Sequence, residues 1–177
     1  MNEPSGTQMF NTLLQDAAYL QEELNALKQV IGAIPYTERP LEQESVLDMI
    51  TRIGYAQSAC FLPAIQLVMQ AGNMKTTIQP DYKKTFQPHD YDDIPVDTII
   101  DRIIAERKLL ISLLSEAPSS AIYDRNPVNV MGSKSLYELI EEMVNYERDQ
   151  LKQVAERVLS IDIDHRSKPD NHVKGAS

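Results

Sequence analysis

The chain of 177 residues is long enough for one domain with a sizeable hydrophobic core. It carries 17 Lys and Arg against 26 Asp and Glu, a formal net charge of −9, and the basic residues form no clustered stripe. Affinity for nucleic acids and for anionic membrane surfaces comes largely from Lys and Arg that neutralise phosphates, so this balance argues against both kinds of partner.

Cysteine content and hydropathy narrow the class of protein further. Cys60 is the single cysteine, so the chain forms no intramolecular disulfide and has no metal site built from several cysteines. The segment MNEPSGTQMF has neither the basic nor the apolar region of a secretory signal, and no apolar run approaches the ~20 residues that span a bilayer. We therefore expect a cytoplasmic protein without a membrane partner.

The first predicted element is an amphipathic helix over residues 7–31. Its apolar residues recur every three or four positions and so form one stripe along the helix. They are Phe10, Leu13, Leu14, Ala17, Leu20, Leu24, Leu27 and Ile31. Residues 33–40, which include two prolines, are predicted to be a connector.

A second helix is predicted over residues 41–71, again from a stripe of apolar residues. Pro63 lies inside this pattern and removes one backbone hydrogen bond, but the stripe continues unshifted on both sides. We therefore expect a kink between residues 59 and 63 rather than a break. Gly54 in the same helix indicates the close approach of another helix.

The connection after the second helix is long. Residues 72–94 show no sustained period and include Pro80 and Pro88. A connection of this length permits a crossover along the bundle, so that the second and third helices run parallel instead of forming a tight hairpin. The third helix is predicted over residues 95–116, and a second irregular stretch follows over residues 117–134.

The fourth predicted helix begins with a capping box, in which Ser135 is the N-cap and Glu138 stands three residues on, and it continues to about residue 159. Beyond it, residues 161–177 are polar and unperiodic and predict a tail with little structure. Four helices without a convincing strand predict an all-α protein, a four-helix bundle over residues 1–160 with a long crossover between helices two and three.

Two polar residues of the fourth helix stand where a bundle expects core residues. Tyr146 and Gln150 are spaced i and i+4, so their side chains lie on one face about 6 Å apart, which suits two ligands of a metal ion. The residue types do not suit a metal, because a neutral Gln carbonyl binds weakly and a Tyr phenol must first lose a proton whose reference pKa is about 10.

The segments VLDMITRIGYAQSACFLPAI and SLYELIEEMVNYERDQLKQV, within a four-helix arrangement, resemble the DinB and YfiT-like superfamily, whose bundles are related to metal-dependent hydrolases and thiol transferases. The resemblance covers roughly residues 8–160. In that family three histidines hold a divalent metal, and here their positions fall on Met49, Tyr146 and Gln150. The surrounding frame is retained at Asn145, Glu147, Arg148, Asp149, Leu151, Lys152 and Gln153.

The resemblance implies a homologue whose metal site has degenerated, with no metal and no cofactor, and the loss of the histidines argues against an enzyme. It implies binding of a small ligand or a protein partner, and a homodimer, because related bundles often pair. Met49, Tyr146 and Gln150 then either fill the core, with the two polar groups hydrogen-bonded, or line a cavity for a small organic ligand. The alternative is a metal-dependent hydrolase or thiol transferase with non-standard metal ligands.

The remaining histidines and the cysteine give weaker indications. His89, His165 and His172 lie in the crossover and the tail, so no predicted helix offers the ExxH pair of a di-iron carboxylate site. Cys60 falls on an apolar stripe, which is typical of a small buried hydrophobe, and a nucleophile is the alternative.

Several charged residues are placed by their spacing. Asp48 and Arg52 are four residues apart on the second helix and predict a surface ion pair. Arg107 interrupts the stripe of the third helix, and its acidic partner lies either at the end of the bundle or across a dimer interface. Glu147 lies near the edge of the fourth stripe, where a carboxylate is solvated or paired with a cation.

Overall fold

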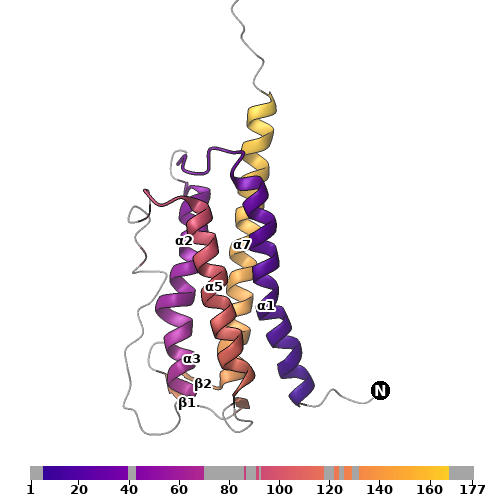
Figure 1. Ribbon diagram of the computed structural model, residues 1–177, viewed down its shortest axis with the longest axis vertical. Coiled ribbons are helices and arrows are strands. Elements are labelled where there is room, and N and C mark those ends of the chain that lie inside the picture. The colour runs from indigo at the N-terminus through magenta and orange to yellow at the C-terminus, as the bar shows by residue number, and fades with distance from the viewer. Residues whose placement is uncertain are drawn as a thin grey trace, which may run out of the picture.

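The computed structural model describes residues 6–39, 43–69, 86, 91, 93–117, 122–123, 126–128 and 132–167. Its helices are α1 (Gly6–Ile31), α2 (Val46–Tyr55), the π-helix η1 (Ala56–Phe61), α3 (Leu62–Met69), α5 (Val96–Ser115) and α7 (Leu136–Ser167). A short antiparallel hairpin pairs β1 (Asn126–Val128) with β2 (Gly132–Lys134). Because α2, η1 and α3 follow one another without a break, the helices form a four-helix bundle, and the all-α prediction is confirmed (Figure 1). The hairpin differs from the prediction, since it lies in the stretch 117–134 that was expected to be irregular.

The helices differ in direction along the bundle. α1 and α7 run one way, whereas the rod of α2, η1 and α3 runs the other way, and α5 is parallel to that rod (Figure 1). Two contacts agree with this parallel direction. Gly54 of the rod lies against Ile103 of α5, and Gln57, further along the rod, is hydrogen-bonded to Arg107, further along α5. Parallel neighbours require a connection that returns along the bundle, as a crossover does. Most of that connection lies outside the described residues.

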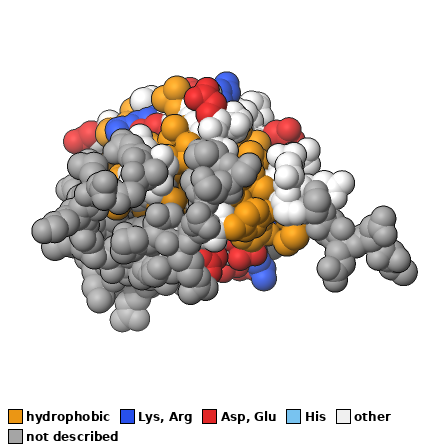
Figure 2. Space-filling view, turned by 90° about the horizontal axis from the view of Figure 1, so that it is seen from below, with side chains coloured by type: hydrophobic (Ala, Val, Ile, Leu, Met, Phe, Trp, Pro, Cys, Tyr) orange, Lys and Arg blue, Asp and Glu red, His pale blue; other side chains and the backbone are white. Residues whose placement is uncertain are grey.

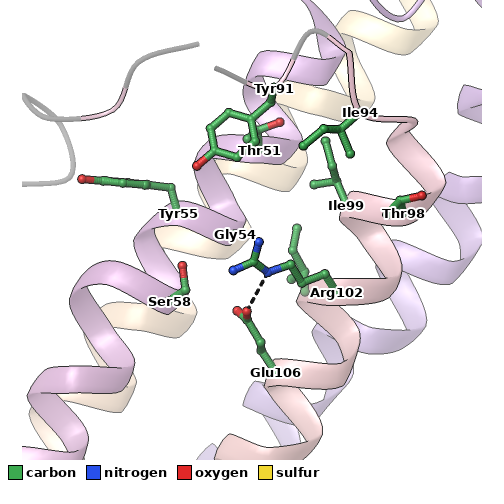
Figure 3. A pocket seen from close by; sticks show the side chains of 11 residues that line it. Thr51, Gly54, Tyr55, Ser58, Tyr91, Ile94, Thr98, Ile99, Arg102 and Glu106 are labelled. Atoms are coloured by element: carbon green, nitrogen blue, oxygen red, sulfur yellow. Dashed lines mark hydrogen bonds and ion pairs between the residues drawn. The ribbon is translucent and has the colours of Figure 1, made fainter. Parts of the chain in front are cut away.

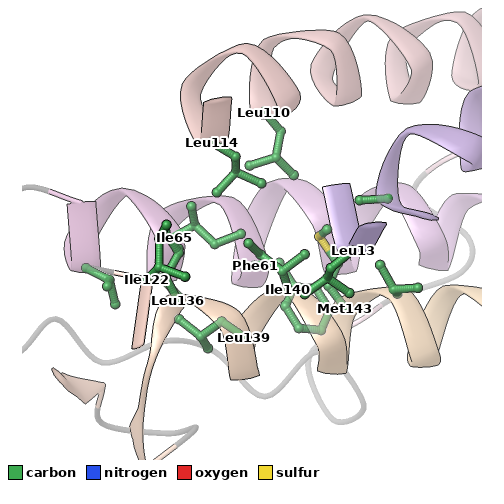
Figure 4. Packing of buried hydrophobic residues seen from close by; sticks show 14 of the residues in the cluster. Leu13, Phe61, Ile65, Leu110, Leu114, Ile122, Leu136, Leu139, Ile140 and Met143 are labelled. Carbon is green, nitrogen blue, oxygen red and sulfur yellow. The ribbon is translucent and has the colours of Figure 1, made fainter. Parts of the chain in front are cut away.

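The core consists of two apolar clusters stacked along the bundle axis, a lower one on the side of α3 and an upper one on the side of α2. The lower cluster includes Phe61, Ile65, Leu110, Leu114, Ile140 and Met143 (Figure 4). The upper cluster includes Leu24, Leu47, Ile50, Ile100, Ile103 and Val154. α1 contributes to both, because its predicted stripe is buried at Phe10, Leu13, Ala17, Leu20, Leu24 and Ile31.

The disturbance predicted around Pro63 takes the form of a π-helix. At the end of η1 the backbone N–H of Leu62 donates to the carbonyl of Gln57, five residues back, and α-helical geometry resumes in α3. A proline ring in a regular α-helix crowds the carbonyl four residues before it, here that of Ala59. The wider π turn accommodates this ring without ending the rod.

Gly54 lies where α2 passes close to α5, as predicted. A Cβ atom built on Gly54 would lie 2.8 Å from Cγ1 of Ile103 and 3.1 Å from its Cδ1. Side-chain carbons do not pack at the shorter of these distances, so a larger residue would displace Ile103 or push the helices apart. The absent side chain therefore sets the spacing between α2 and α5.

The end of the fourth helix differs from the prediction. α7 continues to Ser167, so the segment predicted as a tail from residue 161 begins as helix. Ile161 explains the extension, because it continues the spacing of Val154 and Val158 and is buried against the upper cluster. Residues 168–177, the rest of the predicted tail, lie outside the described residues.

Capping boxes fix the starts of two helices, α2 and α7. In the predicted box, the Ser135 N–H donates to Glu138 Oε2 at 2.7 Å and the Glu138 N–H donates to Ser135 Oγ at 3.2 Å. A second box, formed by Ser45 and Asp48, starts α2 at Val46 rather than near residue 41. The sequence pattern for this box was present, with Asp in place of the usual Glu.

No helix in the described part of the chain is long and apolar enough to cross a membrane.

Figure 2 looks along the bundle from the end at which α1 begins, and apolar side chains are visible there between polar ones. Met9 and Tyr123 are exposed hydrophobic residues of this end, where the Tyr123 hydroxyl donates a hydrogen bond to the carbonyl of Gly6.

Candidate functional site

A buried polar layer, made of Gln57, Arg107 and Glu147, separates the two apolar clusters. Arg107 of α5 lies at its centre with 0% of its surface exposed. Its Nε donates to Gln57 Oε1 at 2.8 Å, and its Nη1 donates to the carbonyl of Ala17 at 3.2 Å. Its Nη2 donates to the Glu147 carboxylate. One guanidinium thus links α5 to α1, η1 and α7.

Every member of the polar layer has a partner. Gln57 also donates through Nε2 to the carbonyl of Ile103 at 3.2 Å. Burial raises the pKa of the Glu147 carboxyl, and the charge and hydrogen bond of Arg107 oppose that rise. The partner of Arg107 is therefore Glu147 of the same chain in the middle of the bundle, so the predicted places for this partner, the end of the bundle and a dimer interface, are both wrong. A buried and fully paired network holds helices together and leaves no group for a substrate.

Tyr146 lies beside the polar layer on α7. Its ring packs against that of Phe61, with the centroids 6.2 Å apart. Burial lowers the pKa of Arg52 on α2, and the electrostatic influence of Tyr146 opposes this shift. Arg52 forms an ion pair with Glu44, and its Cζ lies 5.9 Å from the centroid of the Phe86 ring. Tyr146 is therefore within electrostatic reach of a largely buried cation.

The predicted surface ion pair between Asp48 and Arg52 is wrong. Asp48 is only 1% exposed, and its carboxylate accepts hydrogen bonds from Arg39 Nε at 2.8 Å, from Arg39 Nη2 at 2.7 Å and from the Ser45 N–H at 2.9 Å. Burial tends to raise the pKa of Asp48, but these hydrogen bonds outweigh it and hold the pKa below its usual value. The Asp48 carboxylate therefore caps α2 and binds Arg39 of the preceding connector, instead of pairing with Arg52 as the i, i+4 spacing predicted.

Met49 and Gln150 complete the position that the sequence singled out. Met49 is buried in the upper cluster, whereas Tyr146 packs against the lower one, so the position spans the junction of the two clusters. Gln150 is 8% exposed, and its Oε1 is buried without a hydrogen-bond donor among the described residues. A buried acceptor in this state costs about 1–3 kcal/mol. Gln150 is thus the polar group of this region that a bound molecule would satisfy.

The other candidate residues do not converge on a site. Cys60 is buried in the lower cluster, as expected of a small core hydrophobe. His89 and His172 lie outside the described residues, and His165 lies near the end of α7. Within the described ranges, no three His, Cys, Asp or Glu side chains are grouped so that they could hold a metal ion.

Comparisons with known proteins add no family. No protein-family model matches the chain, and a comparison with curated proteins finds no match. Two segments resemble the DinB and YfiT-like superfamily. The first lies on the rod of α2, η1 and α3, the second lies on α7, and the rod packs against α7. The family resemblance stays a prediction from those segments.

Proposed function

We propose that the chain is a DinB/YfiT-like four-helix bundle whose metal triad has been replaced, and that the former metal position binds a small organic ligand. The parallel arrangement of α2 and α5 supports the bundle type, because it fits the expected crossover. Met49, Tyr146 and Gln150 stand on α2 and α7, which pack against each other. Their position at the junction of the two apolar clusters surrounds them with apolar side chains and few polar groups, which are the surroundings typical of sites for small organic molecules.

The observation that carries the proposal is the buried Oε1 of Gln150. Among the described residues no donor reaches it, whereas the nearby polar layer of Gln57, Arg107 and Glu147 is fully paired. A ligand N–H or O–H group would supply the missing hydrogen bond and recover the desolvation cost. We therefore expect a small neutral molecule of the amide or alcohol type, with an apolar part against the Tyr146 ring.

Metal chemistry has less support at this position. The donor atoms of Met49, Tyr146 and Gln150 are a thioether, a phenol and a neutral amide, and none of them suits a hard or borderline divalent ion. A hydrolase or transferase of the alternative kind would have to draw its metal ligands from other residues. The proposal accordingly assigns binding, and no catalytic step, to this site.

Propionamide is expected to shift the side-chain amide resonance of Gln150 saturably in ¹H–¹⁵N NMR spectra. The variant Gln150→Met identifies that resonance by its disappearance. N,N-dimethylpropionamide keeps the carbonyl and lacks the N–H donor, so it is expected to leave the resonance in place. An equal response to the two amides, or a response to neither, would remove the support for a site that binds a donor.

The triple variant Met49→His, Tyr146→His, Gln150→His is expected to bind zinc, because neutral imidazoles are strong zinc ligands. Zinc at 100 times its dissociation constant adds about 2.7 kcal/mol, which raises the melting temperature of a chain of this size by roughly 5–10 °C. A folded triple variant that does not respond to zinc would show that the three positions do not converge. Wild-type protein purified without chelators is the control, and stoichiometric metal in its elemental analysis would favour the hydrolase or transferase alternative.

A further inference from the structure

A pocket with a volume of about 140 Å³ lies between α2 and α5 (Figure 3). Thr51, Gly54 and Ser58 line it from α2 and η1, at a spacing that places them on one face of the rod. Met49, Tyr146 and Gln150 are not among the residues that line this pocket. The pocket therefore needs an explanation of its own.

The floor of the pocket is apolar. Gly54 contributes no side chain, and three isoleucines line the pocket: Ile94, Ile99 and Ile103. Because Gly54 brings the two helices together, the hollow beside it stays narrow. A cavity of about 150 Å³ lined by aliphatic side chains holds one benzene molecule. The hollow between α2 and α5 thus matches a single six-membered ring or a branched aliphatic group of similar size.

One cation stands at the edge of the apolar floor. Arg102 donates from Nε to Glu106 Oε1 at 3.0 Å, and its side chain is 72% exposed. Within the described part of the chain Arg102 makes no other hydrogen bond or ion pair, so its two Nη groups are available to a ligand. Figure 3 shows the guanidinium lying over the pocket between Gly54 and Glu106.

The charge pattern favours an anionic ligand over a cationic one. Glu106 is engaged on both oxygens, by Arg102 at 3.0 Å and by Gln57 Nε2 at 3.5 Å, so it has little capacity left for a ligand cation. The guanidinium, in contrast, presents two parallel N–H groups of the kind that bind a carboxylate in a fork. Ser58 is a second polar residue in the lining of the pocket.

We propose that the pocket between α2 and α5 binds a small carboxylic acid of benzoate size, with its ring on the isoleucine floor and its carboxylate on Arg102. This site is separate from the Gln150 position and shares no residue with it. Failure of either proposal leaves the other standing, because each depends on its own resonances and its own variants.

Benzoate, titrated into the wild-type protein and followed by ¹H–¹⁵N NMR, is expected to shift the backbone resonances of Gly54 and Ile103 with a dissociation constant on the order of millimolar. Benzamide has the same shape and no charge, and it is expected to bind about tenfold more weakly. Arg102→Gln should weaken benzoate to the level of benzamide, and Arg102→Lys should give an intermediate affinity because it keeps the charge and loses the fork.

Lys108→Gln is the matched control, since Lys108 is an exposed cation of the same helix and its loss changes the net charge equally. It should leave benzoate binding unchanged. Benzoate affinity that survives Arg102→Gln, or that falls equally in the Lys108 variant, would overturn the proposal. Shifts confined to resonances away from Gly54 and Ile103 would also overturn it.

Discussion

Replacing Arg107 by Met is expected to lower the free energy of unfolding by about 3–5 kcal/mol, because it leaves the Glu147 carboxylate buried without its cation. Gln57 also loses the donor that its Oε1 accepts from at 2.8 Å. Urea unfolding followed by circular dichroism at pH 7 measures the loss. Lys108→Met is the surface control on the same helix, and it should change stability by no more than about 0.5 kcal/mol.

The double variant Arg107→Met, Glu147→Leu separates the cost of an orphaned charge from the worth of the pair. It is expected to recover at least about half of the stability lost in the single variant, because apolar replacements of both partners leave no buried charge. A double variant as unstable as Arg107→Met would show that the loss comes from packing around Arg107 alone.

The same pair predicts a pH dependence. Burial raises the pKa of Glu147 above its value in the unfolded chain, so folding favours the protonated form and stability falls as pH rises from the unfolded pKa toward the folded one. Without Arg107 nothing opposes the effect of burial, so the pKa of Glu147 rises further. The deficit of Arg107→Met should therefore shrink between pH 7 and pH 5, whereas that of the double variant, which has no carboxyl at position 147, should not shrink.

Asp48→Ala is expected to lower the free energy of unfolding by about 2–4 kcal/mol. The substitution removes the acceptor for the Ser45 N–H at the start of α2 and both hydrogen bonds from Arg39. Loss of a capping interaction alone costs about 0.5–2 kcal/mol. Arg39 is exposed enough to be resolvated, so the loss should be smaller than for Arg107. Thermal or urea unfolding at pH 7 measures it.

Glu138→Ala provides the comparison, because Glu138 caps α7 in the same geometry from a less buried position. This substitution should cost about 1 kcal/mol.

Asp48 also predicts a pH dependence. The pKa of Asp48 is held below its unfolded value, so its contribution to stability is present above the unfolded pKa and is lost as pH falls through the folded pKa. The difference between wild type and Asp48→Asn should accordingly vanish in strong acid. A difference that persists there would argue against the ionised carboxylate as its source.

Local patterns predicted the helices because each depends on neighbours in the sequence. Apolar spacing located α1 and α5, and the Ser135 and Glu138 pair located the start of α7. The helix end near residue 159 was wrong because polar residues after it hid the contribution of Ile161, which only the upper cluster reveals.

Pairing across the bundle was beyond the sequence because it depends on which side chains meet in three dimensions. Spacing on one helix predicted that Asp48 pairs with Arg52, yet Asp48 accepts hydrogen bonds from Arg39 of the preceding connector. Gln57 stands in an apolar stripe, as Arg107 does, and two polar interruptions on different helices were the available signal for the polar layer.

The sequence predicted that the candidate residues share a face of their helix, but it could not predict their hydrogen bonds. The i, i+4 spacing of Tyr146 and Gln150 placed both on one face of α7, but whether an amide oxygen finds a donor depends on the helices around it. The pocket between α2 and α5 had only Gly54 as a sign, since its lining residues come from segments that meet only in three dimensions.

The polar layer also determines how the helices can slide. Arg107 bonds partners on three other segments at one height of the bundle: Ala17, Gln57 and Glu147. An axial shift of α5 by one turn, about 5.4 Å, would carry its guanidinium into an apolar cluster and away from all of them. Apolar side chains alone tolerate such a shift, because one layer of leucine and isoleucine resembles the next. Arg107 therefore selects a single register of α5 from several of similar apolar packing.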